Sequence, residues 1–186
     1  MTSACRRTAD VLVAVTDEQL GAVTPCEKYR LDQLIGHVGG LALAFAAAAR
    51  KEFGDLTDTP PAEGATLDAD WRSAYPARLA ALAAAWRQPG AWEGMTRAGG
   101  VDFPADVGGL VALTEVVLHG WDLARATGQT YSVDDDVAQA VLAHLRQFAS
   151  GEPVEGLFGP AVPVADDAPV LDRIAGLSGR DPRWPA

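Results

Sequence analysis

Residues 31–53 read LDQLIGHVGGLALAFAAAARKEF, and this stretch decides the fold class. Large apolar side chains recur in it every three or four residues: Leu31, Leu34, Ile35, Val38, Leu41 and Phe45. That spacing places them on one face of an α-helix, as the buried face of a core helix requires. Gly39 and Gly40 lie within the helix and weaken it by about 1 kcal/mol each. We expect these glycines to let another helix approach closely.

The rest of the chain repeats the helical pattern. Further helices are expected at residues 3–15, 67–87, 105–126 and 133–149, with a last short one at 170–177. Pro76 should kink or split its helix, because proline lacks the N–H of a helical bond and clashes with the preceding turn. Residues 54–66 predict a loop, and residues 91–104 predict a loop or short extended pieces.

These elements predict an all-α fold, a four-helix bundle followed by a Pro/Gly-rich tail from about residue 152. The chain of 186 residues suits a single domain over residues 1–186. It contains 35 alanines, the best helix former, and 48% of its residues are hydrophobic, enough for a sizeable core. The composition and the helical spacing therefore both predict an all-α fold.

Charge and cysteine content exclude several classes of function. The net charge of −10 argues against nucleic acid as a partner, because phosphate binding needs a concentrated basic face. The chain contains no run of 18 apolar residues, so no membrane span is expected, and no apolar signal core follows the N-terminal basic pair. Two cysteines, Cys5 and Cys26, make no disulfide framework. We therefore expect a cytoplasmic protein.

The helix at 105–126 carries ionisable side chains along the middle of an apolar face. At 100° per residue, Glu115 and His119 lie about 40° apart, and Asp122 lies about 20° from Glu115 on its other side. Burying an unpaired carboxylate is costly unless a cation or hydrogen bonds compensate it. His37, beside the apolar stripe of residues 31–53, could face this pair across a bundle.

Two histidines and one glutamate leave an open coordination position. That donor set is the pattern of catalytic zinc, and it also suits non-haem iron. Without a metal, the same residues would form a His–Glu hydrogen bond or salt bridge inside the bundle.

Three motifs, in order along nearly the whole chain, carry a family resemblance. The first is TPCEKYRLDQLIGHV at residues 24–38, and the second is EVVLHGWDLARATG at residues 115–128. The third is the C-terminal series FGP, DDAP, LDR and GRDP, which ends at residue 182. Together they resemble the mycothiol-dependent maleylpyruvate isomerase-like proteins of the DinB/YfiT-like superfamily.

The resemblance implies a DinB/YfiT-like four-helix bundle that holds a divalent metal. It implies His37, Glu115 and His119 as ligands, usually for zinc, with nickel as an alternative. It also implies a low-molecular-weight thiol as cosubstrate. The metal would lower the pKa of the sulfur, and the thiolate would attack a small-molecule electrophile, for isomerisation or for conjugation.

Two departures from the family pattern bear on activity. Tyr29 stands where tryptophan is usual. The full isomerase carries an additional C-terminal domain, and this chain is expected to lack it. We therefore expect a transferase, or a protein with no assigned chemistry, rather than maleylpyruvate isomerase itself.

Further residues near the second motif have alternative roles. Asp122 could orient a ligand imidazole or pair with Arg125 on the helix surface, and a general acid or base is a third possibility. Arg125 could bind the carboxylate of a thiol, although the salt bridge is the preferred interpretation. Trp121 and Trp92 could line an apolar pocket beside the metal.

The remaining candidates are expected to be structural. Cys26 could be a nucleophile, but a small buried residue that holds the turn against the helix at 31–53 is favoured. Cys5 receives no role. His144 lies at the edge of the apolar stripe of residues 133–149 and is expected to be a boundary residue rather than a fourth ligand.

Three functions stay open at this point. The first is a metal-dependent thiol S-transferase or isomerase-like enzyme. The second is a metal-dependent hydrolase, in which the open position would hold water. The third is a non-catalytic stress-response module that binds metal or a small ligand. An apolar outer face on the bundle would indicate a homodimer.

Overall fold

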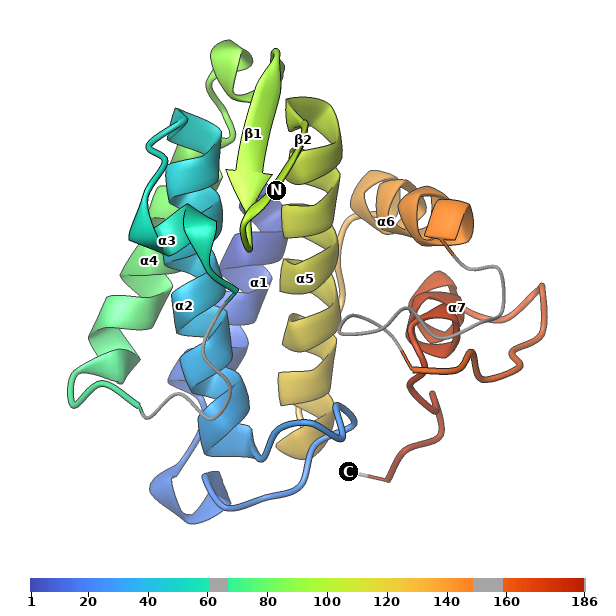
Figure 1. Cartoon of the computed structure of the whole chain (residues 1–186). Helices are drawn as coiled ribbons and strands as arrows, with labels where there is room; N and C mark the ends of the chain where they lie inside the picture. The colour runs from blue at the N-terminus through green and yellow to red at the C-terminus, as the bar shows by residue number, and fades with distance from the viewer. Residues whose placement is uncertain (61–66, 149–158, 186) are drawn as a thin grey trace.

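The computed structural model describes residues 1–60, 67–148 and 159–185. Four helices form a bundle: α1 (Thr2–Val13), α2 (Leu31–Arg50), α4 (Trp71–Ala85) and α5 (Ala105–Ala126). Helices α1 and α2 each pack against both α4 and α5, so α2 and α5 are neighbours in the ring (Figure 1). The predicted four-helix bundle is therefore confirmed.

Helix α2 carries the apolar stripe that the sequence predicts, with Leu31, Leu34 and Ile35 fully buried. It ends at Arg50 rather than residue 53, because Lys51 turns left-handed at φ 58°. Close packing explains the first of the two glycines, since a Cβ at Gly39 would lie 2.6 Å from the ring of Tyr75 on α4. No atom lies within 4 Å of a Cβ built at Gly40, so only Gly39 permits a close approach.

Helix α4 differs from its prediction at both ends and in the middle. It begins at Trp71 rather than residue 67, and it runs unbroken past Pro76 to Ala85. The expected split is wrong, because proline removes one backbone hydrogen bond while Tyr75 and Leu79 on either side are buried in the core. Burial of these flanking side chains offsets the lost bond.

The segments between the long helices contain short elements. Residues 91–104 include the antiparallel hairpin β1 (Met95–Ala98) and β2 (Val101–Pro104), which agrees with the predicted extended pieces. It follows the 3-10 helix η2 (Pro89–Trp92). Helix α3 (Asp55–Asp58) lies in the predicted loop, and the 3-10 helix η1 (Asp17–Gln19) follows α1. The hairpin covers one end of the bundle, where Thr96 Oγ1 donates to the carbonyl of Ala48 at 2.7 Å.

A second layer covers the outer side of α5. Helix α6 (Asp135–Phe148) contacts α5, and α7 (Val170–Leu177) contacts α6 (Figure 1). Both helices lie where the sequence predicts them, while the predicted start of the tail near residue 152 falls outside the described residues. The tail crosses α7 at Val162, whose N–H donates to the carbonyl of Gly176 at 2.9 Å.

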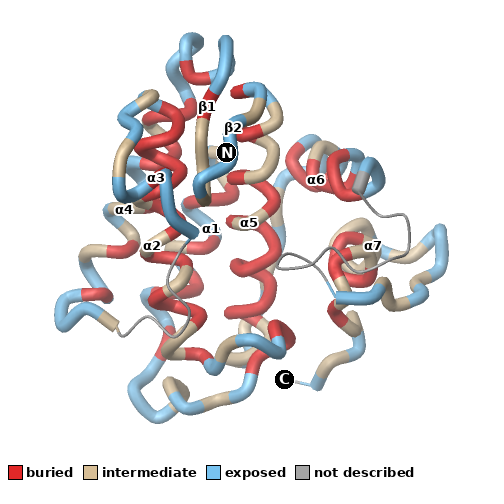
Figure 2. Tube along the Cα trace, viewed as in Figure 1, coloured by how far each residue is buried: buried red, intermediate tan, exposed pale blue. Residues whose placement is uncertain are grey.

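Helices α2 and α5 are long and apolar enough to cross a membrane by length and composition alone. However, 72% of the apolar window of α2 and 78% of that of α5 are buried inside the fold. Figure 2 shows this burial as nearly continuous along the inner sides of both helices. The core role of the two helices therefore accounts for their composition.

Candidate metal centre

Helices α2 and α5 bring the three predicted ligands together. His37 and His119 meet edge to face, with ring centroids 5.0 Å apart and planes at 87°. His119 Nε2 lies 3.1 Å from Glu115 Oε2. One donor atom from each of His37, Glu115 and His119 lies within 4.8 Å of the others. The cluster is close enough for a small shift to close it around a cation.

The site lies at the edge of the core. The side chain of His119 is 7% exposed and that of Glu115 is 15% exposed, while His37 is also only partly buried. Tyr29 covers His37 from the preceding loop, with ring centroids 4.8 Å apart at 28°. The aromatic residue that replaces the usual tryptophan thus stacks directly on a candidate ligand.

His37 carries the clearest sign of a missing partner. Its Nδ1 atom is buried and has no hydrogen-bond partner among the described residues. Burial and the nearby positive charge of His119 lower the pKa of His37 to about 4, although Glu115 opposes this. The imidazole is therefore neutral at pH 7 with a free lone pair, the form that binds a metal ion. These residues fit a divalent cation.

His119 is held on both ring nitrogens. Its Nε2 faces Glu115, and its Nδ1, on the other side of the ring, lies 3.0 Å from Oδ2 of the fully buried Asp122. Burial alone would lower the pKa of His119, but the two carboxylates raise it to about 9. Asp122 itself is kept ionised, because the charge of Arg180 and the bond from His119 lower its pKa against the effect of burial. The pocket is thus built to stabilise positive charge.

One interpretation of Asp122 agrees with this geometry and another is wrong. Asp122 contacts the imidazole of His119, in the position of a group that orients a ligand. It does not pair with Arg125 on the surface. Arg125 Nη2 instead donates to the carbonyl oxygens of Pro182, at 3.2 Å, and Trp184. Arg125 therefore holds the tail and does not face the cluster as a site for a thiol carboxylate.

Neither tryptophan lies where the predicted pocket would need it. Trp121 is about 200° around α5 from His119, and its ring lies 5.7 Å from the guanidinium of Arg125. Trp92 bonds the carbonyl of Trp86 through Nε1 and packs against Gly109, nearer the other end of α5. Both side chains are explained by these local contacts.

Arg180 is the residue that the sequence interpretation missed. It comes from the tail, is 7% exposed, and binds Asp122 through Nη2–Oδ2 at 3.0 Å and Nε–Oδ1 at 3.3 Å. The signal in the sequence was Asp122, a carboxylate on an apolar helix face that needs a compensating positive charge. Its compensating charge lies 58 residues away along the chain, which spacing rules on one helix cannot find.

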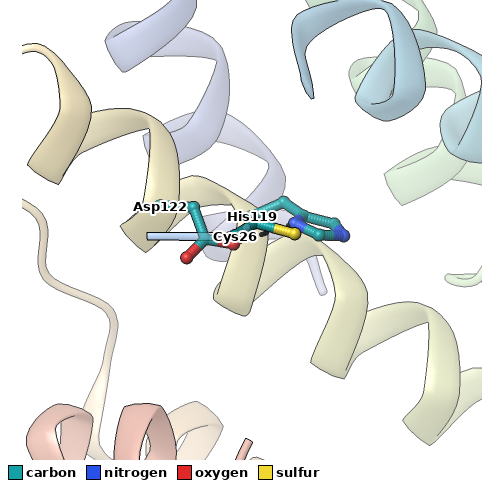
Figure 3. A group of neighbouring side chains, drawn as sticks. All are labelled: Cys26, His119 and Asp122. Atoms are coloured by element: carbon teal, nitrogen blue, oxygen red, sulfur yellow. Dashed lines mark hydrogen bonds and ion pairs between the residues drawn. The ribbon is translucent and has the colours of Figure 1, made fainter. Parts of the chain in front are cut away.

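Cys26 also lies closer to the cluster than expected. Its sulfur, one ring nitrogen of His119 and a carboxylate oxygen of Asp122 all lie within 4.8 Å of one another (Figure 3). Burial raises the pKa of the Cys26 thiol, so the thiol is neutral at pH 7. Its carbonyl accepts a bond from Thr24 Oγ1 at 2.9 Å. The favoured structural role at the turn is consistent with both observations.

The other candidate residues lie away from the cluster. His144 on α6 is 5% exposed, so it is buried rather than a boundary residue, and it belongs to neither ligand group found among the described residues. Cys5 is also buried, which raises its pKa to about 12. Neither residue contributes a fourth ligand.

A helical bundle that presents two imidazoles and a carboxylate from two neighbouring helices defines a class of bundle proteins able to hold a divalent cation. Within that class, the model of the family described as mycothiol maleylpyruvate isomerase N-terminal domain matches residues 1–124. The match covers two thirds of the chain, and the chain belongs to this family. The family predicted from the sequence motifs is confirmed.

The chain is also similar to two sequence relatives and to two solved structures. Two uncharacterized proteins of Mycobacterium tuberculosis, from strains CDC 1551 / Oshkosh and ATCC 25618 / H37Rv, are 31% identical over 183 residues. Each alignment covers 94% of this chain and 92% of the relative. Crystal structures of the mycothiol-dependent maleylpyruvate isomerase and of a histidine-to-alanine mutant share the fold, with TM-scores of 0.64 and 0.65 at 22% identity.

The structural alignment extends beyond the bundle. It covers 95% and 97% of this chain, and 85% and 87% of the two isomerase chains. The expectation that a whole C-terminal domain of the isomerase has no counterpart here disagrees with that coverage. Helix α7 lies in the part that the sequence predicted as a tail, and it packs against α6, so this part of the chain belongs to the fold.

Proposed function

We propose that this protein holds a divalent metal through His37, Glu115 and His119 and uses it to activate a low-molecular-weight thiol of the mycothiol type. The observation that carries the proposal is the unpartnered Nδ1 of His37, buried beside a Glu–His pair whose surroundings stabilise positive charge. Family membership supports the thiol, since the isomerase that shares the fold is mycothiol-dependent.

Different residues of this chain would have different roles at such a site. A bound divalent cation, zinc or nickel, supplies the Lewis acidity that keeps a thiol sulfur deprotonated at neutral pH. Asp122 holds the Nδ1 side of His119, so that Nε2 faces Glu115 and would be the atom that holds the cation. Tyr29 fixes the plane of His37 by stacking. The reaction with the electrophile is conjugation or isomerisation.

Metal affinity tests the site. The protein purified without added metal is titrated with zinc and with nickel, beside His37→Ala, His119→Ala and the control His144→Ala. Loss of a ligand should cost more than the roughly 10–100-fold that loss of an outer partner costs. The control removes a buried histidine outside the cluster and should bind as the wild type does. A wild type that binds neither metal, or a His119→Ala variant that binds equally well, contradicts the ligand assignment.

Thiol-dependent turnover tests the chemistry. The metal-loaded protein is assayed with mycothiol, bacillithiol and glutathione, each with a reactive electrophile for conjugation and with maleylpyruvate for isomerisation. We expect turnover with mycothiol that disappears on removal of the metal and in His37→Ala. Absence of metal-dependent turnover with all three thiols contradicts the enzymatic part. Metal-dependent ester hydrolysis without thiol would instead identify a hydrolase.

A further inference from the structure

Arg180 connects the C-terminal segment to the interior of the bundle. It follows α7 by three residues, and its backbone N–H donates to the carbonyl of Ala175 at 2.9 Å. Its guanidinium donates through Nη1 to the carbonyl of Ser178 at 2.9 Å and binds both oxygens of Asp122. The group is therefore fixed at both ends, which is how a planar guanidinium gives directional recognition of a carboxylate.

Asp122 links Arg180 to the candidate metal centre. Asp122 Oδ2 accepts from Arg180 Nη2 and lies 3.0 Å from His119 Nδ1, and the opposite ring nitrogen lies 3.1 Å from Glu115. Three of the four side chains, those of Arg180, Asp122 and His119, are at least nine-tenths buried. Charged groups in such a network depend strongly on one another, because the low local dielectric makes a missing partner costly.

A second arginine holds the same segment without entering this network. Arg125, three residues after Asp122 on α5, donates to the carbonyls of Pro182 and Trp184. Figure 1 shows the chain end beside the C-terminal part of α5, where both contacts lie. The structure thus offers two anchors for one segment, and only Arg180 touches the partner of His119.

We propose that Arg180 is a positioning residue for the metal centre, and that docking of residues 178–184 and metal binding are energetically coupled through Asp122. The proposal rests on the proposed function for the metal site itself. Arg180 holds both oxygens of Asp122 and so fixes its orientation, and Asp122 in turn accepts from Nδ1 of His119, which leaves Nε2 as the donor atom. The tail is then part of the site rather than an appendage.

Coupling of this kind is reciprocal. If docking of the segment raises the affinity for zinc by some factor, zinc must stabilise docking by the same factor. The backbone N–H of Arg180 is bonded to Ala175 and that of Trp184 to Asp181, so amide hydrogen exchange at these two positions reports how well the segment is ordered. Zinc should slow exchange there in the wild type.

The test compares zinc affinity in Arg180→Ala, Arg125→Ala and Arg183→Ala by competition with a chelator. Arg180→Ala should bind zinc more weakly, by up to the roughly 10–100-fold that losing an outer partner of a metal ligand costs, because it acts through Asp122. Arg125→Ala loosens the same segment but leaves Asp122 paired, so its affinity should fall much less. Arg183→Ala removes an exposed arginine that pairs with Asp181 and should match the wild type.

Several outcomes would overturn the proposal. Equal losses in Arg180→Ala and Arg125→Ala would mean that docking matters but Asp122 does not transmit it. Wild-type affinity in Arg180→Ala would exclude any coupling. If zinc binds the wild type and does not slow amide exchange at Arg180 and Trp184, reciprocity fails. A wild type that binds neither zinc nor nickel contradicts the proposed function, and with it the coupling.

Two further measurements separate positioning from a merely structural role. The ¹⁵N shifts of the His119 ring report which nitrogen carries the proton, and in the zinc-bound wild type Nδ1 should carry it. If Arg180→Ala does not fold, Arg180→Lys replaces it. Lysine keeps the charge but cannot bind both oxygens of Asp122, so zinc affinity should still fall. Unchanged affinity in Arg180→Lys would then overturn the proposal.

Discussion

His37 on α2 and His119 on α5 face each other, yet their helices support them in different ways. His119 lies between two carboxylates, and its pKa rises to about 9. His37 is stacked on Tyr29, its Nδ1 has no partner among the described residues, and its pKa falls to about 4. Two imidazoles 5.0 Å apart thus differ in charge at pH 7 in the metal-free protein, since His119 is protonated and His37 is neutral.

The difference shows what each helix contributes. Helix α5 supplies a ligand together with its supporting network, which stabilises the metal-free fold as well as the site. Helix α2 supplies a ligand whose free nitrogen contributes nothing to the metal-free fold, since a buried polar atom without a partner is a cost. A residue that is retained at such a cost is a functional candidate, and this is why His37 carries the proposal.

The largest predicted effect is on metal-free stability. His119→Leu should lower the free energy of unfolding by about 3–5 kcal/mol, because it leaves Glu115 and Asp122 without a shared cation. His37→Leu should change it by about 1 kcal/mol or less, because no hydrogen bond of Nδ1 is lost. Urea unfolding in the presence of a chelator measures both, and equal losses in the two variants would contradict the comparison.

The next effect is the pH dependence of the metal-free protein. The folded pKa of His119 is raised above its unfolded value, so its contribution is complete below about pH 6.5 and is lost as pH rises through about 9. The folded pKa of His37 is lowered below its unfolded value. His37 therefore does not reduce the free energy of unfolding above about pH 6.5, and it reduces it increasingly as pH falls towards about 4. Each shift corresponds to at most about 3 kcal/mol.

Urea unfolding with chelator at pH 5, 7 and 9 separates the two histidines. His119→Gln should flatten the fall in unfolding free energy between pH 7 and 9, and His37→Gln should flatten the fall between pH 7 and 5. If either variant keeps the wild-type slope in its own interval, the assignment of charge states is wrong.

The smallest effect concerns the two glycines that follow His37 on α2. Gly39→Ala should lower the free energy of unfolding by about 1–3 kcal/mol, because its Cβ would meet the Tyr75 ring at 2.6 Å. Gly40→Ala should raise it by up to about 1 kcal/mol, since its Cβ meets no atom within 4 Å and alanine is the better helix former. Thermal unfolding of the pair measures the difference, and a stabilising Gly39→Ala would mean that Tyr75 can move aside.

Local pattern predicted the parts of the fold that local physics controls. The bounds of α5 and α7 agree with the prediction, because each has a continuous helical period and a clear stop. The bounds of α4 do not agree, and neither does the expected split at Pro76, where burial of Tyr75 and Leu79 keeps the helix continuous. Spacing on one helix also found Glu115 and His119 as a pair, and it placed Asp122 beside them.

By itself, the sequence determined an all-α bundle, the family and three candidate ligands, since helical period and short motifs are properties of neighbouring residues. Only the tertiary structure decided that Arg180 compensates Asp122, that Arg125 holds the tail and that Cys26 lies beside His119. Each of these contacts joins residues more than 50 positions apart. The physical reason is that a buried charge needs a partner near it in space, and the chain can supply that partner from any distance along the sequence.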